Sequence, residues 1–179
     1  GEARPGGAVG SPHASRTCSR GNGRMTATTG RTRLPAVEGF FTMGDDPQLI
    51  GGRLETGGYC FPVHLGGSDP RRPAGGVEEV LLSRCGTIWS FTNSAYPPPP
   101  PFIVAEPYVP VVVAAVELAE EQMVVLGQVT PGWTVDDLEV GMAVKLELGL
   151  LYTEGEVDYM TWQWRPVDGF PDGATGVEA

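Results

Sequence analysis

The chain has 179 residues and a formal net charge of −10 at pH 7, with 26 glycines and 17 prolines, and it is long enough for one ordinary domain with appendages. The charge is unevenly distributed, because residues 1–36 carry +5 from six arginines and one acid, whereas residues 37–179 carry −15. Phosphate contacts supply most of the affinity for nucleic acids, so the acidic part argues against a nucleic-acid partner and favours a basic protein surface.

The cysteine count and the apolar runs argue against two further classes. Three cysteines, Cys18, Cys60 and Cys85, are too few and too scattered for a disulfide framework, which indicates a reducing, cytoplasmic compartment. The longest apolar run, Val109 to Val116, has the length of a strand, and a membrane helix needs roughly 20 apolar residues. We therefore expect neither a membrane span nor a secretory signal.

Residues 1–36 are rich in Gly, Ser, Thr and Arg and contain almost no large apolar side chains. Such a segment cannot bury enough surface to offset its chain entropy, which predicts a disordered basic tail that the fold does not need. Met25 lies within this tail, and residues 1–24 are either an artefact upstream of the natural start or a functional basic arm. A flexible C-terminal tail is expected for residues 168–179.

Residues 37–84 are expected to form a lobe that precedes the main domain. Residues 37–52 predict a short helix or turn that carries Phe40 and Phe41, whereas residues 53–76 read as irregular because Gly and Pro dominate them. The run Glu78–Ser83 predicts a short strand that leads into the following domain.

Five runs within residues 85–167 have the composition and length of β-strands, which predicts a mainly β chain with a small closed antiparallel barrel. These runs are Cys85–Asn93, Val111–Leu118, Gln122–Thr130, Ala143–Tyr152 and Glu156–Trp164. The proline run Pro97–Pro101 stands between the first two strands and predicts a stiff extended connector. A ligand for a proline-binding domain is the alternative interpretation of this run.

Local signals refine the picture of the barrel. In the run Val144–Leu150 every second residue is apolar, so that these residues are expected to share one face. Gly127 and Gly149 predict bulges or sharp bends at the corners of the barrel. The run Thr134–Glu139 predicts one helical turn, with Thr134 as its N-cap and two aspartates in its first turn.

No catalytic constellation is recognisable, and no residue is expected to be catalytic. His64 stands alone in a Gly-rich loop, and Cys85 begins an apolar strand, where a buried and inert thiol is the usual state. The acid pairs Glu120-Glu121 and Asp136-Asp137 fall in predicted turns, where we expect solvated carboxylates.

The order of features from about residue 40 to residue 166 resembles the acyl-CoA-associated zinc-ribbon/OB-fold proteins, known as domain of unknown function 35. The matching residues are Gly52-Arg53, Gly58, Phe61-Pro62, Gly86-Thr87, Ser90-Phe91-Thr92, Pro107-Tyr108, Val113 through Glu117, Leu126-Gly127, Gly141-Met142, Val144 and Arg165-Pro166. No single dipeptide is specific, but the ordered set is. The resemblance implies a short N-terminal helix, a rubredoxin-like ribbon and a five-stranded OB-fold barrel.

The ribbon of this chain departs from the family pattern. Family members carry two Cys-x-x-Cys knuckles, because tetrahedral zinc needs four ligands. Here Leu54 and Gly57 stand at the first knuckle, and residues 66–74 supply no cysteine or histidine for the second. Cys60 and His64 alone do not make a structural zinc site, so a degenerate, metal-free ribbon lobe is expected.

The resemblance also implies a function. Family members accompany thiolase-superfamily enzymes, and the OB-fold subunit supports the complex while its partner performs the chemistry. This chain is therefore expected to hold no cofactor, to lack catalysis on its own, and to bind a thiolase-like (lipid-transfer-protein-like) subunit that takes a CoA thioester. The Arg-, Gly- and Ala-rich composition favours the branch whose partner cleaves steroid side chains by a retro-aldol reaction. An accessory subunit of a thiolase or acyltransferase, and a nucleic-acid-binding OB-fold protein, are the alternatives.

Aromatic residues are the best candidates for a functional surface. Tyr96, Phe102, Pro107 and Tyr108 flank or follow the proline run, and with Phe61 of the ribbon lobe they are expected to form the partner and substrate-channel interface. Two other pairs are ambiguous or structural. Trp162 and Trp164 share one face of the last strand and either stack bases or fill the barrel, whereas Trp89 and Phe91 are expected in the core.

Overall fold

A computed structural model of the chain describes residues 30–55, 57–63, 76–97, 99 and 106–167. The expected tails, residues 1–29 and 168–179, lie outside these ranges, as do His64 and Phe102. The described part consists almost entirely of β-strands, and among the described residues no helix is long and apolar enough to cross a membrane.

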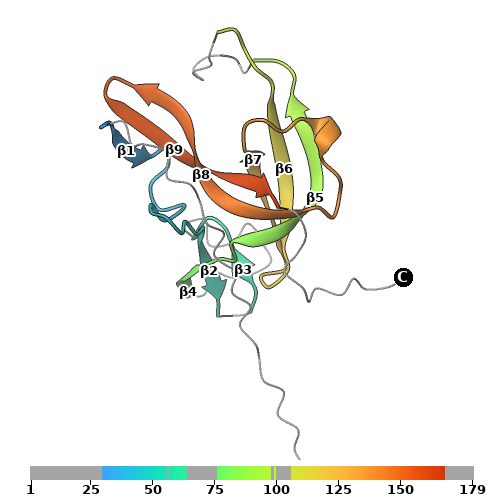
Figure 1. The fold of residues 1–179 in the computed structure, drawn as a ribbon. Coiled ribbons are helices and arrows are strands. Elements are labelled where there is room, and N and C mark those ends of the chain that lie inside the picture. The colour runs from blue at the N-terminus through green and yellow to red at the C-terminus, as the bar shows by residue number, and fades with distance from the viewer. Residues whose placement is uncertain (1–29, 56, 64–75, 98, 100–105, 168–179) are drawn as a thin grey trace, which may run out of the picture.

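Five strands close into the predicted OB-type barrel (Figure 1). They are β5 (Cys85–Ser94), β6 (Val111–Leu118), β7 (Met123–Val129), β8 (Ala143–Glu154) and β9 (Val157–Pro166). The order around the barrel is β5-β6-β7-β9-β8, and β8 pairs again with β5. All neighbours are antiparallel except β7 and β9, which run parallel through Gln128↔Gln163 and Val129↔Trp164. Each predicted strand is confirmed to within two residues.

The barrel interior is filled by the alternating apolar side chains of its strands. On β6, Val112, Ala114, Val116 and Leu118 are all buried, and the intervening residues are more exposed or polar. Val144, Leu146 and Trp164 are completely buried on the facing strands. The predicted face of β8 ends early, because β5 pairs with β8 only as far as Lys145 and Leu150 is 53% exposed.

Gly127 is required for packing and not for a bulge, so the predicted role was wrong. The β6–β7 ladder runs through Ala114↔Gly127 without a register shift. A Cβ at Gly127 would lie 2.7 Å from Nε1 of Trp164 and 2.9 Å from Nε1 of Trp162. The glycine therefore lets two indole rings reach the wall of the barrel. Near Gly149 the predicted irregularity is present, since the register of the β8–β9 ladder shifts between Leu150 and Tyr152.

The connection between β7 and β8 holds one turn of 3-10 helix, η2 (Val135–Asp137), where one helical turn was predicted. Thr134 precedes it as predicted, and its backbone N–H and its hydroxyl donate to Oδ2 of Asp137 at 2.8 and 2.6 Å. These hydrogen bonds, from the hydroxyl first and the backbone second, lower the pKa of the exposed Asp137 carboxyl.

A small antiparallel sheet of order β3-β2-β4 forms the lobe beside the barrel. It consists of β2 (Ile50–Leu54), β3 (Tyr59–Cys60) and β4 (Val77–Leu81). Two expectations are corrected here. The predicted short helix within residues 37–52 is absent, since these residues form turns, a bridge between Phe41 and Leu49, and the start of β2. The strand predicted at Glu78–Ser83 corresponds to β4. It pairs with β2 and so belongs to the sheet of the lobe.

Aromatic rings join the lobe to the barrel. Trp162 of β9 lies 5.7 Å from the ring of Phe61, 5.8 Å from that of Phe41 and 6.1 Å from that of Phe40. Ring pairs of this kind contribute about 0.5–1.5 kcal/mol each beyond their buried area. The indole N–H of Trp162 also donates to the carbonyl of Leu126 at 2.9 Å, so this tryptophan is held between the two parts of the molecule.

The carboxylate of Glu121 also links the barrel to the lobe. Glu121, which the sequence predicted to be solvated, is only 8% exposed, and its Oε1 accepts a hydrogen bond from the backbone N–H of Ser83 at 2.7 Å. Ser83 lies between β4 of the lobe and β5 of the barrel. The prediction was wrong because the β6–β7 turn folds back against this connection.

The tail predicted for residues 1–36 ends earlier than expected. Thr32–Pro35 forms β1, which pairs in parallel with residues Val157–Met160 of β9. Arg31 adds an ion pair to Asp158, with Nε and Oδ1 2.9 Å apart. These residues cover one edge of β9 beyond the point where β7 pairs with it, so the fold uses part of the segment that was expected to be dispensable.

We predict that Gly127→Ala lowers the free energy of unfolding by about 1–3 kcal/mol, because the added methyl group collides with the buried ring of Trp164 and the half-buried ring of Trp162. Denaturant titration followed by tryptophan fluorescence measures the loss. Leu126→Ala on the same strand is the control, since Leu126 is 64% exposed and little buried area is removed. Equal effects of the two variants would show that the rings do not depend on this glycine.

Candidate functional site

The barrel closes through a short seam. β5 pairs with β8 only at Cys85↔Lys145, Gly86↔Val144 and Thr87↔Ala143. Beyond these three pairs the two strands run apart in opposite directions. The β5–β6 hairpin and the β8–β9 hairpin therefore project from the barrel in different directions (Figure 1).

A groove of about 1000 Å³ lies between these projections, and all five barrel strands contribute to its walls. We call it the barrel groove. It is lined by Asn93, Ser94, Tyr108, Val109, Pro110, Val111, Val112, Val113, Gln128, Val129, Thr130, Pro131, Gly132, Trp133, Thr134, Val135, Asp136, Leu150, Leu151 and Gln163. Asp136 is the only charged residue in this lining. The volume is at the upper end of the range for small-molecule and cofactor sites.

Several apolar side chains of the groove are exposed. Val109 is 70% exposed, and Trp133, Leu150 and Leu151 are each between 37% and 53% exposed. Polar side chains lie among the apolar ones, and two of them contact each other, since Nε2 of Gln163 donates to Oε1 of Gln128 at 3.4 Å. An apolar surface with a few polar groups is typical of a site that a partner or ligand covers.

Tyr108 is the predicted interface residue that the structure places in the groove. Its hydroxyl donates to the backbone carbonyl of Ser94 at 2.7 Å and lies 3.0 Å from the Ser94 hydroxyl. Ser94 ends β5, and Tyr108 lies three positions before the start of β6. The tyrosine thus ties together the two ends of the connection that contains the proline run.

The other predicted interface residues differ in their surroundings. Tyr96 is 84% exposed and Pro107 is exposed after a cis peptide bond, so both are accessible within the same connection. Phe102 lies outside the described residues. Phe61 is half-buried against Phe40 and Trp162, which gives it a role in joining the lobe to the barrel.

Sequence reasoning missed Trp133, Leu150 and Leu151 as groove residues. A signal was present at each place. Trp133 is a large aromatic residue in a turn of Pro, Gly and Thr, and the consecutive leucines break the alternation of β8. A large aromatic side chain in a turn is one signal of an apolar binding surface. Two consecutive apolar residues in an otherwise alternating strand are another.

Among the tryptophans of the barrel, Trp89 differs from its predicted burial. Trp164 is completely buried and Trp162 packs in the aromatic joint, so neither ring is free to stack a base. Trp89, which was predicted in the core, is 61% exposed. The reason is a bulge between Ile88 and Ser90, which interrupts the alternation of β5 and turns Trp89 outward.

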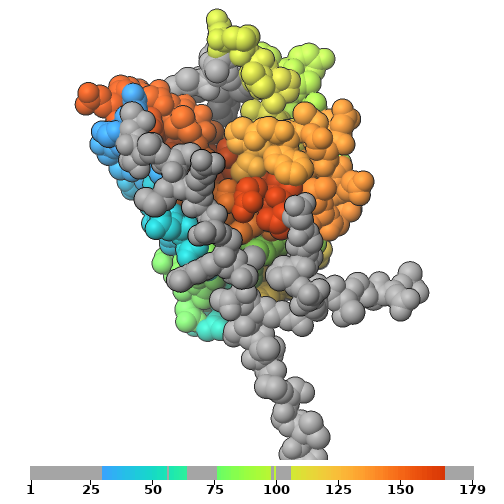
Figure 2. Space-filling view, viewed as in Figure 1, coloured from blue at the N-terminus to red at the C-terminus, as the bar shows by residue number. Residues whose placement is uncertain are grey.

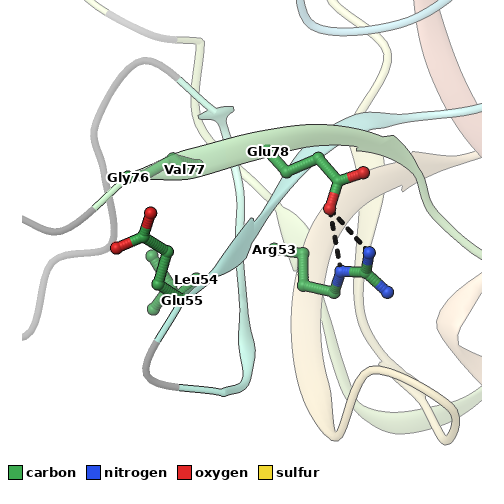
Figure 3. A pocket seen from close by; sticks show the side chains of 6 residues that line it. All are labelled: Arg53, Leu54, Glu55, Gly76, Val77 and Glu78. Atoms are coloured by element: carbon green, nitrogen blue, oxygen red, sulfur yellow. Dashed lines mark hydrogen bonds and ion pairs between the residues drawn. The ribbon is translucent and has the colours of Figure 1, made fainter.

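A second hollow lies on the lobe, between the end of β2 and the start of β4 (Figure 3). Its main feature is the ion pair of Arg53 with Glu78, in which Nη2 and Oε2 are 2.6 Å apart. The hydrogen bond and charge of Glu78 raise the pKa of Arg53. Both side chains are more than half exposed, and solvent screening makes such surface pairs weak. We interpret this hollow as a surface feature of the sheet.

The described residues contain no group of three or more His, Cys, Asp or Glu side chains that could hold a metal ion. Leu54 ends β2 and Gly57 lies in the following turn with a φ of 84°, where the family has its first knuckle. Cys60 is buried against Gly52, whose added Cβ would lie 2.7 Å from Sγ. Residues 66–74, where the second knuckle is expected, lie outside the described ranges.

We predict that the purified chain binds no stoichiometric zinc, because the first knuckle holds Leu54 and Gly57 and residues 66–74 offer no Cys or His. Elemental analysis of protein purified without a His-tag measures the metal content. A content of one zinc per chain that disappears in Cys60→Ser would contradict the prediction and assign Cys60 as a ligand.

Comparison with known proteins gives one family match. Residues 79–148 match the family model described as "ChsH2, C-terminal OB-fold domain". No curated protein matches the chain. Among solved structures, the chain is similar to one titled "Ltp2-ChsH2(DUF35) aldolase", with 26% sequence identity over 66% of this chain and 84% of that chain, and a TM-score of 0.47. The family match supports the predicted OB fold over residues 79–148.

Proposed function

Because residues 79–148 carry an OB-fold domain of the ChsH2 family, we propose that the chain is a non-catalytic subunit of a complex with a thiolase-superfamily enzyme. In this proposal the partner acts on an acyl-CoA thioester, and the barrel groove faces the partner. The observation that carries the proposal is the groove itself, which all five barrel strands line and in which large apolar side chains remain exposed.

Covering the groove would be energetically favourable. Fully burying a Val, Leu or aromatic side chain contributes roughly 1.5–3 kcal/mol relative to leaving it in water. Val109, Leu150 and Leu151 all offer such a gain. The cost of association and of ordering consumes part of it. A groove of this composition therefore supports a stable contact with a complementary apolar surface.

The two described ends of the connection between β5 and β6 are joined to each other in the chain alone. The two contacts of the Tyr108 hydroxyl with Ser94 fix the end of this connection to the barrel. Less conformational entropy is then lost on association. Tyr96 stands on the same connection with its ring in solvent, and aromatic residues commonly dominate the binding energy of interfaces. We propose that this connection contacts the partner and helps to wall its substrate channel.

The finer assignment is retro-aldol cleavage of a steroid side-chain CoA ester by the partner chain. It follows from the branch that the sequence resembles most and from the match to a ChsH2 domain. A thiolase or acyltransferase partner uses the same groove and differs only in the chemistry of the enzyme. Co-expression with the enzyme encoded by the neighbouring gene, followed by size-exclusion chromatography and assay with acyl-CoA esters, distinguishes these cases.

We predict that Tyr96→Ala weakens binding of the enzyme subunit by roughly 1–3 kcal/mol while the melting temperature stays unchanged, since the Tyr96 ring is exposed. Tyr108→Ala lowers both the affinity for the enzyme subunit and the melting temperature, because it also removes the contacts to Ser94. Phe102→Ala is expected to behave like Tyr96→Ala. Affinity and thermal melting are measured for each variant.

Two controls separate the interface from the fold. Trp89→Ala removes an exposed aromatic ring outside the groove lining and should leave affinity unchanged. Leu146→Ala removes a completely buried side chain and should lower the melting temperature most. If Tyr96→Ala and Phe102→Ala keep full affinity while Trp89→Ala loses it, the interface lies on the surface around Trp89 and not at the groove.

A further inference from the structure

One edge of β8 is open over most of its length. β9 pairs with β8 from Val144 to Glu154, whereas β5 reaches only as far as Lys145. The last backbone bond on the β5 side is from the N–H of Leu146 to the carbonyl of Arg84, at 2.7 Å. For residues 147–154 no strand among the described parts of the chain pairs on that side.

The opposite edge of the same hairpin is covered. β1 pairs in parallel with residues 157–160 of β9, so the projecting hairpin forms a three-stranded sheet in the order β1-β9-β8 (Figure 1). In the space-filling view the outer part of this arm reaches well beyond the rest of the barrel (Figure 2). One edge of the arm is thus paired with a strand from a remote part of the sequence, whereas the described residues supply no strand for the other edge.

The direction of the free backbone groups follows from the observed bond. In an antiparallel strand the N–H and C=O of one residue point to the same side, and the side alternates along the strand. Because Leu146 donates toward the β5 side, Leu148 and Leu150 present their backbone groups to the open side. The register shift after Leu150 ends this regular stretch, so the available edge is short.

Apolar side chains lie next to these groups. Leu150 and Leu151 are both exposed and line the barrel groove together with Val109 and Trp133. Recognition of a peptide by strand addition needs both features, since main-chain hydrogen bonds provide affinity and neighbouring pockets accept alternate side chains.

The charges decide the kind of partner. Glu154 lies at the end of the open stretch, and the described groove lining contains Asp136 but neither Lys nor Arg. Glu147 does not add to this charge, because its Oε1 is ion-paired with Nε of Arg165 at 2.7 Å. A second copy of the chain would bring another acidic edge, from a region of net charge −15, and like charges across paired strands are destabilising. We propose that the open edge of β8 at Leu148–Leu150 accepts a short extended segment of another protein that alternates apolar and basic side chains.

The test uses the whole chain and an acetylated, amidated hexapeptide of alternating Val and Lys. Amide hydrogen exchange read by NMR should slow at least about tenfold at Leu148 and Leu150 when the peptide is present at saturation. The same peptide with alternate amides N-methylated keeps its charge and side chains but cannot pair, and should give no protection. A peptide with Glu in place of Lys should bind more weakly.

On the protein, Leu150→Lys should abolish the protection, and Val140→Lys should not, since Val140 is 69% exposed and outside the groove lining. No protection by the Val-Lys peptide at millimolar concentration would overturn the proposal. Equal protection by the N-methylated peptide would overturn it too, because it would show side-chain binding without strand addition. Equal binding of the Glu peptide would refute the basic character of the partner. The enzyme subunit is not used, so a negative result leaves the proposed function standing.

Discussion

The short seam between β5 and β8 is the constraint on which the rest of the structure depends. Three residue pairs close the barrel, which is sufficient to enclose Val144, Leu146 and Trp164 completely. Because the two strands diverge after this seam, the same closure leaves a groove between the hairpins and an unpaired stretch of β8. A longer seam would bury this stretch and remove the surface on which the proposed contacts depend.

The lobe and the barrel are coupled through a small number of rigid contacts. Trp162 packs against Phe61 and Phe41, and the buried carboxylate of Glu121 holds the backbone of Ser83 at the junction. Aromatic contacts and a charge-assisted hydrogen bond fix orientation more strictly than apolar contacts alone. The sequence of the ribbon lacks the four metal ligands of the family pattern. We therefore expect these contacts to hold the lobe to the barrel.

Local patterns predicted most of the fold, and long-range packing decided what they missed. The five strands were predictable because their apolar residues alternate or form short continuous runs. Gly127 was misread, since its role depends on two tryptophans that lie far along the chain. Glu121 was predicted to be solvated because composition does not show that its turn folds back against Ser83. Trp89 was predicted to be buried because composition does not show the bulge in β5. Within the site, Tyr108 was predicted, whereas Leu150 and Leu151 are groove residues because β5 pairs with β8 no further than Lys145, which the local pattern does not show.

The most direct measurement is hydrogen exchange of the whole chain alone and in complex with its enzyme subunit. If the groove is the interface, protection should appear on both of its walls, at residues 93–96 and 108–113 on one side and 128–133 and 147–151 on the other. The exposed surface around Arg53 and Glu78 on the lobe should exchange equally in both states. Protection confined to the lobe, with the groove unchanged, would contradict the account and move the functional surface to the degenerate ribbon.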